Sequence, residues 1–447
     1  YITGKIQDYI PASCSITVEI DSEGNYGSDK DGQIKERQDL IQPIDMNTES
    51  QELPQKAAKL NASFNFHPTN LLTQGSHTFR VTIKNPAGLI GTSTTKEGFD
   101  WIPFEIIPKP TLLWQKEFEQ NVGNISMTGD GKYIVVDTMP DESETNKIYM
   151  FDKEGNIVWQ HSSTEYGSTS FCFISISKNG SYIAAGMSIP GEFEGMSGLL
   201  YFDKNGKLLW KVSGVLPDDF SLSDDGEYIL MADPIGSWYV WLYNKNGEKL
   251  WEKTGIMGAP IISGDGNYIL IYNQLFNKEG SLLWGKDGFI RSGISKNGNI
   301  IVGWRHSTLR TFDLSGNLLG EYSCKSKNEV LYPVLSENGE YIIATNNLMD
   351  KAYFFNNNCS LLWEKEYSSH DLKEFGAITN DGKYCAVVYG SLSIDIFNEK
   401  GEIVGQINLE SENGGEVIMP WSSDGRYMAI TERKKKLYFY DTSSIIK

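Results

Sequence analysis

Short apolar runs alternate with polar, glycine-containing turns along residues 111–447. Tyr133–Val136 and Ile148–Phe151 are two such runs, and β-branched and aromatic residues are frequent in them. Runs of this kind, bounded by Asp/Asn–Gly turns, predict β-strands joined in hairpins. No apolar run reaches the roughly 18 residues that a membrane-spanning helix requires. The pattern therefore predicts an all-β protein without a membrane span in this chain.

One turn recurs eight times, as x-(Asp/Asn)-Gly-x followed by an aromatic or aliphatic residue. Successive copies are 49, 46, 40, 32, 41, 43 and 43 residues apart. Asp, Asn and Gly supply the backbone angles that tight hairpins need. The residues that follow the eight turns are Tyr133, Tyr182, Tyr228, Tyr268, Ile300, Tyr341, Tyr384 and Tyr427.

A second turn follows each copy of the first. It reads FDKEG at 151–155, FDKNG at 202–206, YNKNG at 243–247, FNKEG at 276–280, FDLSG at 312–316, FNNNC at 355–359, FNEKG at 397–401 and YDTSS at 440–444. An apolar pair and a Trp come after most of them, namely Trp159, Trp210, Trp251, Trp284 and Trp363. Gly320 and Gly405 occupy the Trp place in two repeats.

Two hairpins in each repeat of about 42 residues make one four-stranded antiparallel sheet. Such a sheet buries both faces only when sheets stack radially, so eight repeats predict an eight-bladed β-propeller at residues 111–447. The last repeat ends at Lys447 without a Trp strand, and Thr111–Trp114 matches that missing strand. We therefore expect residues 111–118 to pair beside 436–441 and close the ring. The alternative is a seven-bladed ring with one irregular segment.

The motif FDKxGxxLW resembles the PQQ-like repeat of quinoprotein dehydrogenases and of outer-membrane assembly propellers. The S-x-D-G-x-Y-I half resembles WD40-like and TolB-like propellers. In such families the Trp packs between neighbouring blades, and the resemblance implies the same structural role here. Quinoprotein dehydrogenases also carry a vicinal cysteine pair, which this sequence lacks. The resemblance therefore predicts the propeller fold but argues against a PQQ enzyme.

Residues 1–110 follow another pattern. Thr78–Lys84 alternates apolar and polar positions, and Ser15–Ile20, Ala62–Phe66 and Trp101–Ile107 are further strand candidates. The run from Leu72 to Thr82 resembles the G-x-H-x-V strand of bacterial and archaeal Ig-like surface domains. This resemblance implies a small Ig-like β-sandwich domain at residues 1–110.

The formal net charge is −18, from 58 acidic and 40 basic residues. An acidic surface repels phosphates, which argues against nucleic acid as a partner. The five cysteines, Cys14, Cys172, Cys324, Cys359 and Cys385, show no CxxC spacing. Zinc and haem attachment therefore lack support, and disulfides are not the framework of the fold.

The sequence contains no G-x-S-x-G, P-loop or H-E-x-x-H motif, and no catalytic residue or organic cofactor is predicted. The best single candidate for a lyase or lactonase site is His306, in an inter-strand loop of blade five. The alternative is a surface or rim histidine without a catalytic role. Asp21, Asp29 and Asp31 resemble a fragment of a calcium loop, but no Glu completes the pattern. A plain polar turn is the alternative to bound calcium.

Two surface features complete the candidate sites. Acidic residues Asp141, Glu142 and Glu144 fall in one inter-strand loop, and Glu192 and Glu194 in the matching loop of the next blade, which predicts a local acidic face for a basic partner or divalent cations. N-x-S/T sequons place candidate glycans at Asn61, Asn124, Asn179 and Asn358.

These features favour a non-enzymatic secreted or cell-surface binding and assembly protein. The propeller would be the interaction scaffold, and the N-terminal domain would attach the protein or mediate self-association, with strand addition by Tyr1–Ile6 as one route. The alternative is that this strand folds back into its own sandwich and leaves a monomer. An extracellular propeller enzyme and a periplasmic assembly scaffold are the alternatives. The chain begins at Tyr1 rather than Met, which agrees with removal of a signal peptide or of another leading segment.

Overall fold

The computed structural model divides the chain into two compact units, residues 1–108 and 109–447. In the first unit it describes the strands. In the second it describes residues 109–139, 145–167, 170–188, 198–213, 219–233, 239–256, 258–286, 291–305, 307–326, 329–367, 372, 376–390, 393–409, 417–432 and 434–446.

The first unit contains two antiparallel sheets. One has the order β1-β5-β4, and the other has the order β3-β2-β6-β7 with β8 also on β6. The first residues of the chain lie in β1, which pairs with β5 of the same chain. The strands are β1 (Ile2–Asp8), β2 (Ser15–Ile20), β3 (Gln42–Pro43), β4 (Asn47–Ser50), β5 (Leu60–Phe66), β6 (Gly75–Lys84), β7 (Ile90–Thr92) and β8 (Ile102–Ile106).

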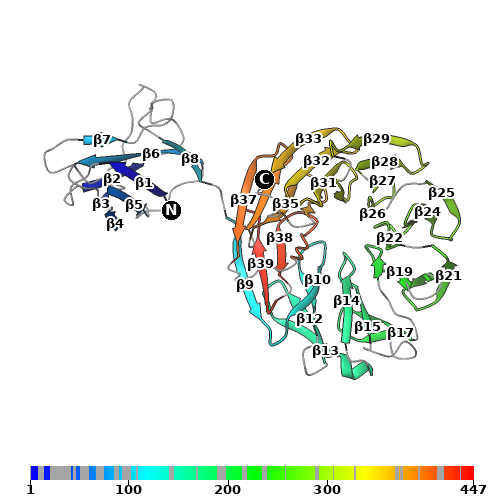
Figure 1. The fold of residues 1–447 in the computed structure, drawn as a ribbon. Helices are drawn as coiled ribbons and strands as arrows, with labels where there is room; N and C mark the ends of the chain where they lie inside the picture. Colours follow the sequence, from blue (N-terminus) through cyan, green and yellow to red (C-terminus); the bar gives the residue numbers. More distant parts are fainter. Residues whose placement is uncertain are drawn as a thin grey trace. The chain divides into compact units, whose positions relative to one another are not determined.

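The second unit is an eight-bladed β-propeller, in which consecutive sheets surround an axis and the first strand of each blade lies innermost (Figure 1). Seven blades are four-stranded antiparallel sheets formed by consecutive strands.

The strands of these blades run in chain order. Blade 1 has β10 (Val122–Met127), β11 (Tyr133–Thr138), β12 (Lys147–Asp152) and β13 (Ile157–Ser162). Blade 2 has β14 (Ser170–Ile176), β15 (Tyr182–Ser188), β16 (Gly198–Asp203) and β17 (Leu208–Ser213). Blade 3 has β18 (Asp219–Leu222), β19 (Tyr228–Asp233), β20 (Tyr239–Asn244) and β21 (Lys249–Thr254). Blade 4 has β22 (Pro260–Ile262), β23 (Tyr268–Ile271), β24 (Gln274–Asn277) and β25 (Leu282–Gly285).

The remaining four-stranded blades follow the same order. Blade 5 has β26 (Arg291–Ile294), β27 (Ile300–Arg305), β28 (Thr308–Asp313) and β29 (Leu318–Ser323). Blade 6 has β30 (Leu331–Leu335), β31 (Tyr341–Asn346), β32 (Lys351–Asn356) and β33 (Leu361–Glu366). Blade 7 has β34 (Ala377–Ile378), β35 (Tyr384–Tyr389), β36 (Ser393–Asn398) and β37 (Ile403–Asn408). A 3₁₀ turn, η2 (Ser163–Tyr166), connects blades 1 and 2.

The eighth blade joins the two ends of the ring. Its outer strand β9 (Thr111–Glu117) pairs antiparallel with β39 (Lys436–Asp441), which pairs with β38 (Tyr427–Thr431). The predicted closure by residues 111–118 is therefore confirmed. The innermost position of this blade is not a regular strand, because residues 418–421 pair with β38 through isolated bridges at Ile418 and Trp421. Pro420, which lacks a backbone N–H, lies between the two bridges.

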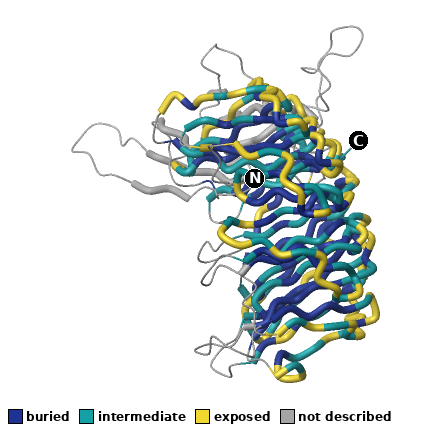
Figure 2. Tube along the Cα trace, turned by 90° about the vertical axis from the view of Figure 1, so that its right-hand side faces the viewer, coloured by how far each residue is buried: buried dark blue, intermediate teal, exposed yellow. Residues whose placement is uncertain are grey.

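The core lies between blades. The second and third strands of the blades are largely buried, whereas the turns that follow the third strands are mostly exposed (Figure 2). Both faces of a blade are covered by neighbours, so these strands read as apolar runs rather than as alternating ones. Each sheet has two short edges, the first strand at the axis and the outer strand at the rim.

A Ser or Thr precedes each first turn and holds it in place. In blade 3 the backbone N–H of Tyr228 donates to Ser223 Oγ (3.1 Å), and that hydroxyl donates to Asp225 Oδ1 (2.7 Å). Gly226 has a φ of 72°, the left-handed region that Gly enters without a steric penalty. The same hydroxyl-to-backbone bond recurs at Thr128, Ser177, Ser263, Ser295, Ser336, Thr379 and Ser422.

Candidate interaction surfaces

The Trp residues of the outer strands lie between neighbouring blades, as predicted. The indole N–H of Trp159 donates to Lys204 O (3.2 Å), and a Cβ on Gly206 would stand 2.8 Å from the indole ring. Each such Trp therefore requires Gly in the turn of the next blade. Equivalent bonds run from Trp114, Trp210, Trp251 and Trp284 to carbonyls of the following blade, and Trp363 lies in the same way against Gly401.

The two repeats that lack this Trp fill the same space differently. A Cβ on Gly320 would overlap the carbonyl oxygen of Asn358, which lies in the next blade's turn. That turn carries Cys359 at a φ of 59° instead of Gly. At Gly405 the space is taken by Ile445, to which a Cβ would come within 2.6 Å. The residue lost from one blade is thus replaced by atoms of the next.

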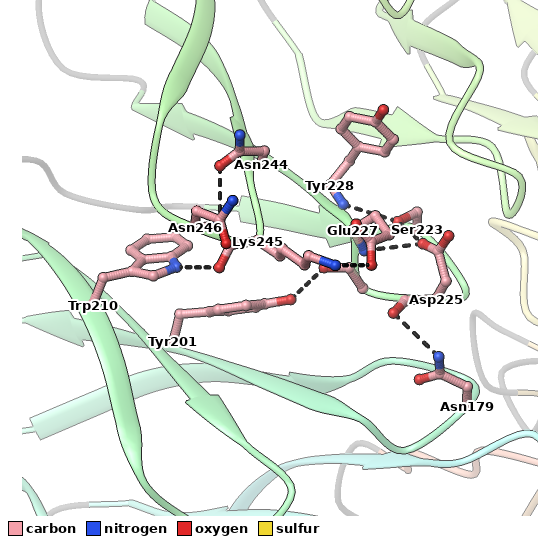
Figure 3. Close-up of polar contacts among 11 residues, drawn as sticks. Asn179, Tyr201, Trp210, Ser223, Asp225, Glu227, Tyr228, Asn244, Lys245 and Asn246 are labelled. Carbon is pink, nitrogen blue, oxygen red and sulfur yellow. Dashed lines mark hydrogen bonds and ion pairs between the residues drawn. The ribbon is translucent and has the colours of Figure 1, made fainter.

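Figure 3 shows how one seam is joined at the turns, between blades 2 and 3. Tyr201 donates its hydroxyl to Gly226 O (2.5 Å), and Trp210 donates to Lys245 O (2.8 Å). Asn179 Nδ2 donates across the seam to Asp225 O (3.2 Å), and within blade 3 Lys245 pairs with Glu227 (2.7 Å). Desolvation raises the pKa of Tyr201 far above its usual value, so its hydroxyl stays protonated as a donor.

A ring of backbone hydrogen bonds joins the first turns around the axis. Seven seams carry an N–H to C=O bond of 2.7–3.1 Å between one turn and the next, for example from Gly129 to Lys178 and from Lys296 to Glu337. Two ion pairs also link blades that are not neighbours. They are Lys178 Nζ with Glu337 Oε1 (3.0 Å) and Lys296 Nζ with Asp224 Oδ2 (2.6 Å). These contacts stabilise the turn end of the propeller.

The central cavity has a volume of about 430 Å³. Small and apolar side chains of the inner strands line it, including Ser126, Ser175, Ser221 and Ala377, with Lys178 and Asp224 at the turn end. In the described part of the chain, no three His, Cys, Asp or Glu side chains gather as metal ligands. The cavity residues therefore offer hydroxyl and apolar contacts, and Asp224 and Lys178 are engaged in the ion pairs across the axis.

The outer strands expose the apolar pair that precedes the Trp. Seven blades contribute residues that are 37–55% exposed: Leu112, Leu113, Ile157, Val158, Leu209, Leu250, Leu282, Leu283, Leu318, Leu319, Leu361 and Leu362. The register between the third and fourth strands shifts at the second residue of the pair in all eight blades. Such a bulge disrupts regular strand pairing at this edge and turns side chains outward. We call these pairs the rim pairs.

A groove of about 610 Å³ lies at the seam between blades 8 and 1. Phe118 and Tyr149 contact each other edge to face in it, with ring centroids 5.4 Å apart, and Phe118 also contacts Phe151 (6.1 Å). The polar lining includes Lys116, Glu117, Glu119, Gln120, Lys147 and Gln160. We call this the closure groove.

All residues of the predicted acidic face and calcium site, and the candidate His306, lie outside the described residues. These are Asp141, Glu142, Glu144, Glu192 and Glu194 of the acidic face, Asp21, Asp29 and Asp31 of the calcium prediction, and His306. The acidic face, bound calcium and a catalytic role for His306 therefore stay predictions.

The structure distinguishes three of the four predicted glycosylation positions by their side-chain contacts. Asn124 donates to Asp137 Oδ2 (3.1 Å) and to Cys172 O (3.0 Å), so its amide is engaged between blades 1 and 2. Asn179 is held in the ring of turns. Asn179 and Asn358 are both exposed, and Asn358 accepts the Ser360 hydroxyl (2.7 Å). Asn61 lies in β5, where only the backbone is described.

The described cysteines, Cys172, Cys324, Cys359 and Cys385, are free thiols, and all but Cys172 are buried. Burial raises the pKa of Cys324 to about 12 and also raises the pKa of Cys359 and Cys385. A thiol is a weak nucleophile until it ionises, so these three groups act as small apolar core residues.

The sequence pattern did not single out the closure groove or the ion pairs across the axis. Phe118 directly follows β9 of the eighth blade, and Tyr149 lies in β12 of the first blade, so the two residues meet at the closure. The signal available was the predicted pairing of 111–118 with 436–441, which places Phe118 next to blade 1. The rim pairs were visible in the repeat, but their exposure depends on the bulge.

Comparison with protein-family profiles and with curated proteins finds no match for this sequence. Solved structures show the fold. The C-terminal WD40 domain of Sif2 superposes with a TM-score of 0.59 at 13% identity, covering 75% of this chain and 99% of that one. Sqt1 from Chaetomium thermophilum has a TM-score of 0.58 at 12% identity and covers 75% and 99%. The Dos1 propeller has a TM-score of 0.54 at 11% identity and covers 74% and 95%. The second unit is thus similar to WD40 propellers. No helix in the described residues is long and apolar enough to cross a membrane.

Proposed function

We propose that this protein is a non-enzymatic scaffold, secreted or at the cell surface, that binds another protein through the rim of its propeller. The N-terminal unit, for which we propose an Ig-like fold, attaches the scaffold or lets copies associate. The propeller repeats are of the PQQ-like and WD40-like type in this proposal, without their enzymatic cofactor.

The rim pairs are the observation that carries this proposal. The Trp and Gly of the repeats are accounted for by contacts between blades, whereas one or both residues of the rim pair are 37–55% exposed in seven blades. Recurring exposed apolar side chains favour contact with a partner's apolar surface. The bulge beside each pair favours binding through side chains rather than through strand addition at this edge.

The geometry near the axis supports a scaffold over an enzyme. The titratable residues at the turn end of the cavity, Lys178 and Asp224, are held in ion pairs. The buried carboxylate of Glu329 is likewise occupied, because it accepts from Tyr353 (2.5 Å) and from Asn346 (3.0 Å). The ion pairs and hydrogen bonds of these groups therefore have a structural role in the fold.

In the first unit, β1 and β4 are the edge strands of their sheet, and β3 and β7 are the ends of the other sheet's strand order. Exposed edges are pairing sites for another chain. This supports attachment or self-association through the N-terminal unit.

The test compares the full chain with a rim variant that carries Leu282→Ser, Leu283→Ser, Leu318→Ser and Leu319→Ser on two neighbouring blades. The matched control carries four substitutions at exposed turn positions, Glu154→Ser, Asn205→Ser, Glu279→Ser and Lys400→Ser. Each protein is immobilised, and the extracellular and cell-surface proteins that it captures are quantified by mass spectrometry.

We expect at least one protein that the wild type and the turn control capture equally and that the rim variant loses by about tenfold, which corresponds to about 1.4 kcal/mol of binding free energy. Circular dichroism checks that all three chains are folded. The same capture by the rim variant and the wild type, or no specific capture by either, would overturn the proposal.

A further inference from the structure

The connection between blades 1 and 2 contains a histidine whose two ring nitrogens both lie close to oxygen atoms. His161 belongs to β13, the strand directly before η2, and its side chain is 20% exposed. Its Nε2 lies 2.8 Å from Gly206 O in the second turn of blade 2. Its Nδ1 lies 2.9 Å from Glu165 Oε2 and 3.1 Å from the Tyr166 hydroxyl, so two groups of η2 compete for one nitrogen.

Aromatic rings hold the imidazole in this position. It stacks on Phe202 of blade 2, with centroids 5.3 Å apart and ring planes at 18°, and its centroid lies 5.3 Å from that of Trp159. Tyr166 meets both the imidazole and Phe202 edge to face, each at 5.6 Å. Because these contacts fix the ring, its hydrogen-bond partners decide where its protons lie.

The partners of the two nitrogens differ in what they can donate. A carbonyl oxygen only accepts, so the bond to Gly206 O places a proton on Nε2. In the neutral imidazole Nδ1 is then an acceptor, and Tyr166 O–H can donate to it whereas the Glu165 carboxylate cannot. In the imidazolium Nδ1 also carries a proton, and the carboxylate accepts it. Protonation of the ring therefore changes the partner of Nδ1.

Both neighbours of Nδ1 keep one charge state between pH 5 and pH 8. Burial raises the pKa of Glu165, but hydrogen bonds from Ser162 N and from the imidazole outweigh it and hold that pKa below its usual value, so the carboxylate is ionised. Burial raises the pKa of Tyr166 to about 12, so its hydroxyl keeps its proton. Histidine is the side chain that ordinarily changes charge in this range, at about pH 6.5. The exchange of partners therefore depends on the imidazole.

The other charged groups on the elements packed against His161 come from the second turn of blade 2 and from β12. They are Asp203, Lys204, Lys207 and Lys147. The Asp203 carboxylate accepts from Asn205 N (2.8 Å) and Lys207 N (3.0 Å) within its own turn. In the described part of the chain, none of these four side chains forms a hydrogen bond or ion pair with the imidazole, which leaves Glu165 as its charged partner.

We propose that His161 is a pH-sensitive switch that changes how η2 is fastened to the seam between blades 1 and 2. While the imidazole is neutral, Tyr166 holds η2 by donating its hydroxyl to Nδ1. Once the imidazole is protonated, Glu165 holds η2 through an ion pair, and the Tyr166 hydroxyl loses its acceptor. The bond from Nε2 to Gly206 O is common to both states and keeps the ring in the seam. The switch is a property of the propeller itself and does not depend on the partner proposed for the rim.

Glu165→Gln separates the two states, because the amide replaces one acceptor by a donor. The Gln Oε1 can still accept from Ser162 N, as the carboxylate does at 2.8 Å. Its NH₂ group can donate to Nδ1 of the neutral ring but meets a second donor when Nδ1 is protonated. Hydrogen exchange of residues 160–167, followed by mass spectrometry at millisecond labelling times, reports the opening of η2. One of its reporters is Ser163 N, which donates to Asn146 O (3.0 Å).

The two variants should respond to pH in opposite ways. At pH 5 Glu165→Gln should exchange about tenfold faster than the wild type, which corresponds to about 1.4 kcal/mol for the loss of a charged hydrogen bond. At pH 8 it should exchange no faster than the wild type. Tyr166→Phe should exchange about threefold faster at pH 8 and like the wild type at pH 5. Each comparison is made at a single pH, so the pH dependence of the chemical exchange rate cancels.

Two controls isolate the imidazole. Tyr322→Phe removes a tyrosine hydroxyl at the seam between blades 5 and 6, where the ring packs edge to face on Phe355 (4.8 Å), so its effect on residues 318–325 should be the same at both pH values. In a His161→Gln background, whose side chain does not titrate, Glu165→Gln should have equal effects at pH 5 and pH 8. Circular dichroism checks that all variants are folded.

Equal acceleration by Glu165→Gln at pH 5 and pH 8 would overturn the switch and leave Glu165 with a capping role alone. A pH dependence that persists in the His161→Gln background would overturn it as well, because another group would then be the one that titrates.

Discussion

The seam between blades 1 and 2 and the seam between blades 5 and 6 fill the same space with different residues. In the first, Trp159 occupies it and Gly206 of the next turn stays small. In the second, Gly320 stays small, and the next turn approaches it with Asn358 O and has Cys359 in place of Gly. Two atoms cannot share one volume in a close-packed interior, so a position in one repeat restricts a position in the next. The unit of design in this ring is therefore the seam rather than the single repeat.

Among the substitutions that test this comparison, Gly320→Ala should cause the largest loss of unfolding free energy. Its methyl group would overlap the carbonyl oxygen of Asn358, which is backbone and cannot rotate away. We expect a loss of about 3 kcal/mol in unfolding free energy, in the upper range of overpacking. Urea unfolding followed by tryptophan fluorescence measures it.

The control is Leu319→Ala in the neighbouring rim position, where the side chain is exposed and the expected change is within about 0.5 kcal/mol. An unchanged urea midpoint for Gly320→Ala would show that the turn moves freely and that the two positions are not coupled.

Trp159→Ala should cause the second-largest loss of unfolding free energy. The indole packs against the turn of blade 2 and donates to Lys204 O, but the residue is only partly buried, so we expect a loss of about 2 kcal/mol, below the usual range for a core Trp. In this background Gly206→Ala should cost less than in the wild type, because the ring that its Cβ would meet is gone. A double-mutant cycle from urea unfolding measures the coupling.

Additive effects of Trp159→Ala and Gly206→Ala would contradict the seam argument. The strain at Gly206, with a φ of 81°, is common to both backgrounds and cancels in the cycle.

The repeating part of these seams could be predicted from the sequence, and the irregular part could not. Trp159 and Gly206 recur at fixed offsets, so their packing and the closure by residues 111–118 followed from the pattern. The closure groove depends on Phe118, which follows β9 of the eighth blade, and on Tyr149 of β12 in blade 1, and neither residue belongs to a repeated motif. The ion pair of Lys178 with Glu337 joins blades far apart in the chain, and repeat spacing says nothing of such a contact.

The ring of first turns around the axis should make the unfolding free energy of the protein depend on pH. Burial raises the pKa of Asp265, but hydrogen bonds from Ser263 and Asn267 outweigh it and hold that pKa below its usual value. A carboxylate with a lowered folded-state pKa stabilises the fold above its unfolded pKa of about 3.9. That contribution is lost as the pH falls through the folded-state pKa.

Asp265→Asn should therefore flatten the dependence of stability on pH below about 4, because it lowers stability at pH 7, where the carboxylate contributes, and changes it least at pH 2.5. Asn297 already has this position in blade 5 and accepts from Ser295 Oγ (3.0 Å) and Asn299 N (3.1 Å), so the Asn side chain fits the turn. Urea midpoints from pH 2.5 to 7 test it. Parallel curves for the two proteins would contradict a role for this carboxylate.

The smallest effect should come from the ion pair across the axis, which tests whether distant blades are coupled as neighbouring ones are. Lys178 and Glu337 have side chains that are 40% and 23% exposed, so water screens their attraction. Lys178→Met and Glu337→Gln should each cost little, and their coupling energy in a double-mutant cycle should be about 0.2–1 kcal/mol. That value should fall between 0.05 M and 1 M NaCl, because salt screens partly exposed charges. The coupling between Trp159 and Gly206 comes from steric contact and should not change with salt. A salt-independent coupling for the ion pair, or one as large as the steric coupling, would mean that the axis joins distant blades as firmly as the seams join neighbours.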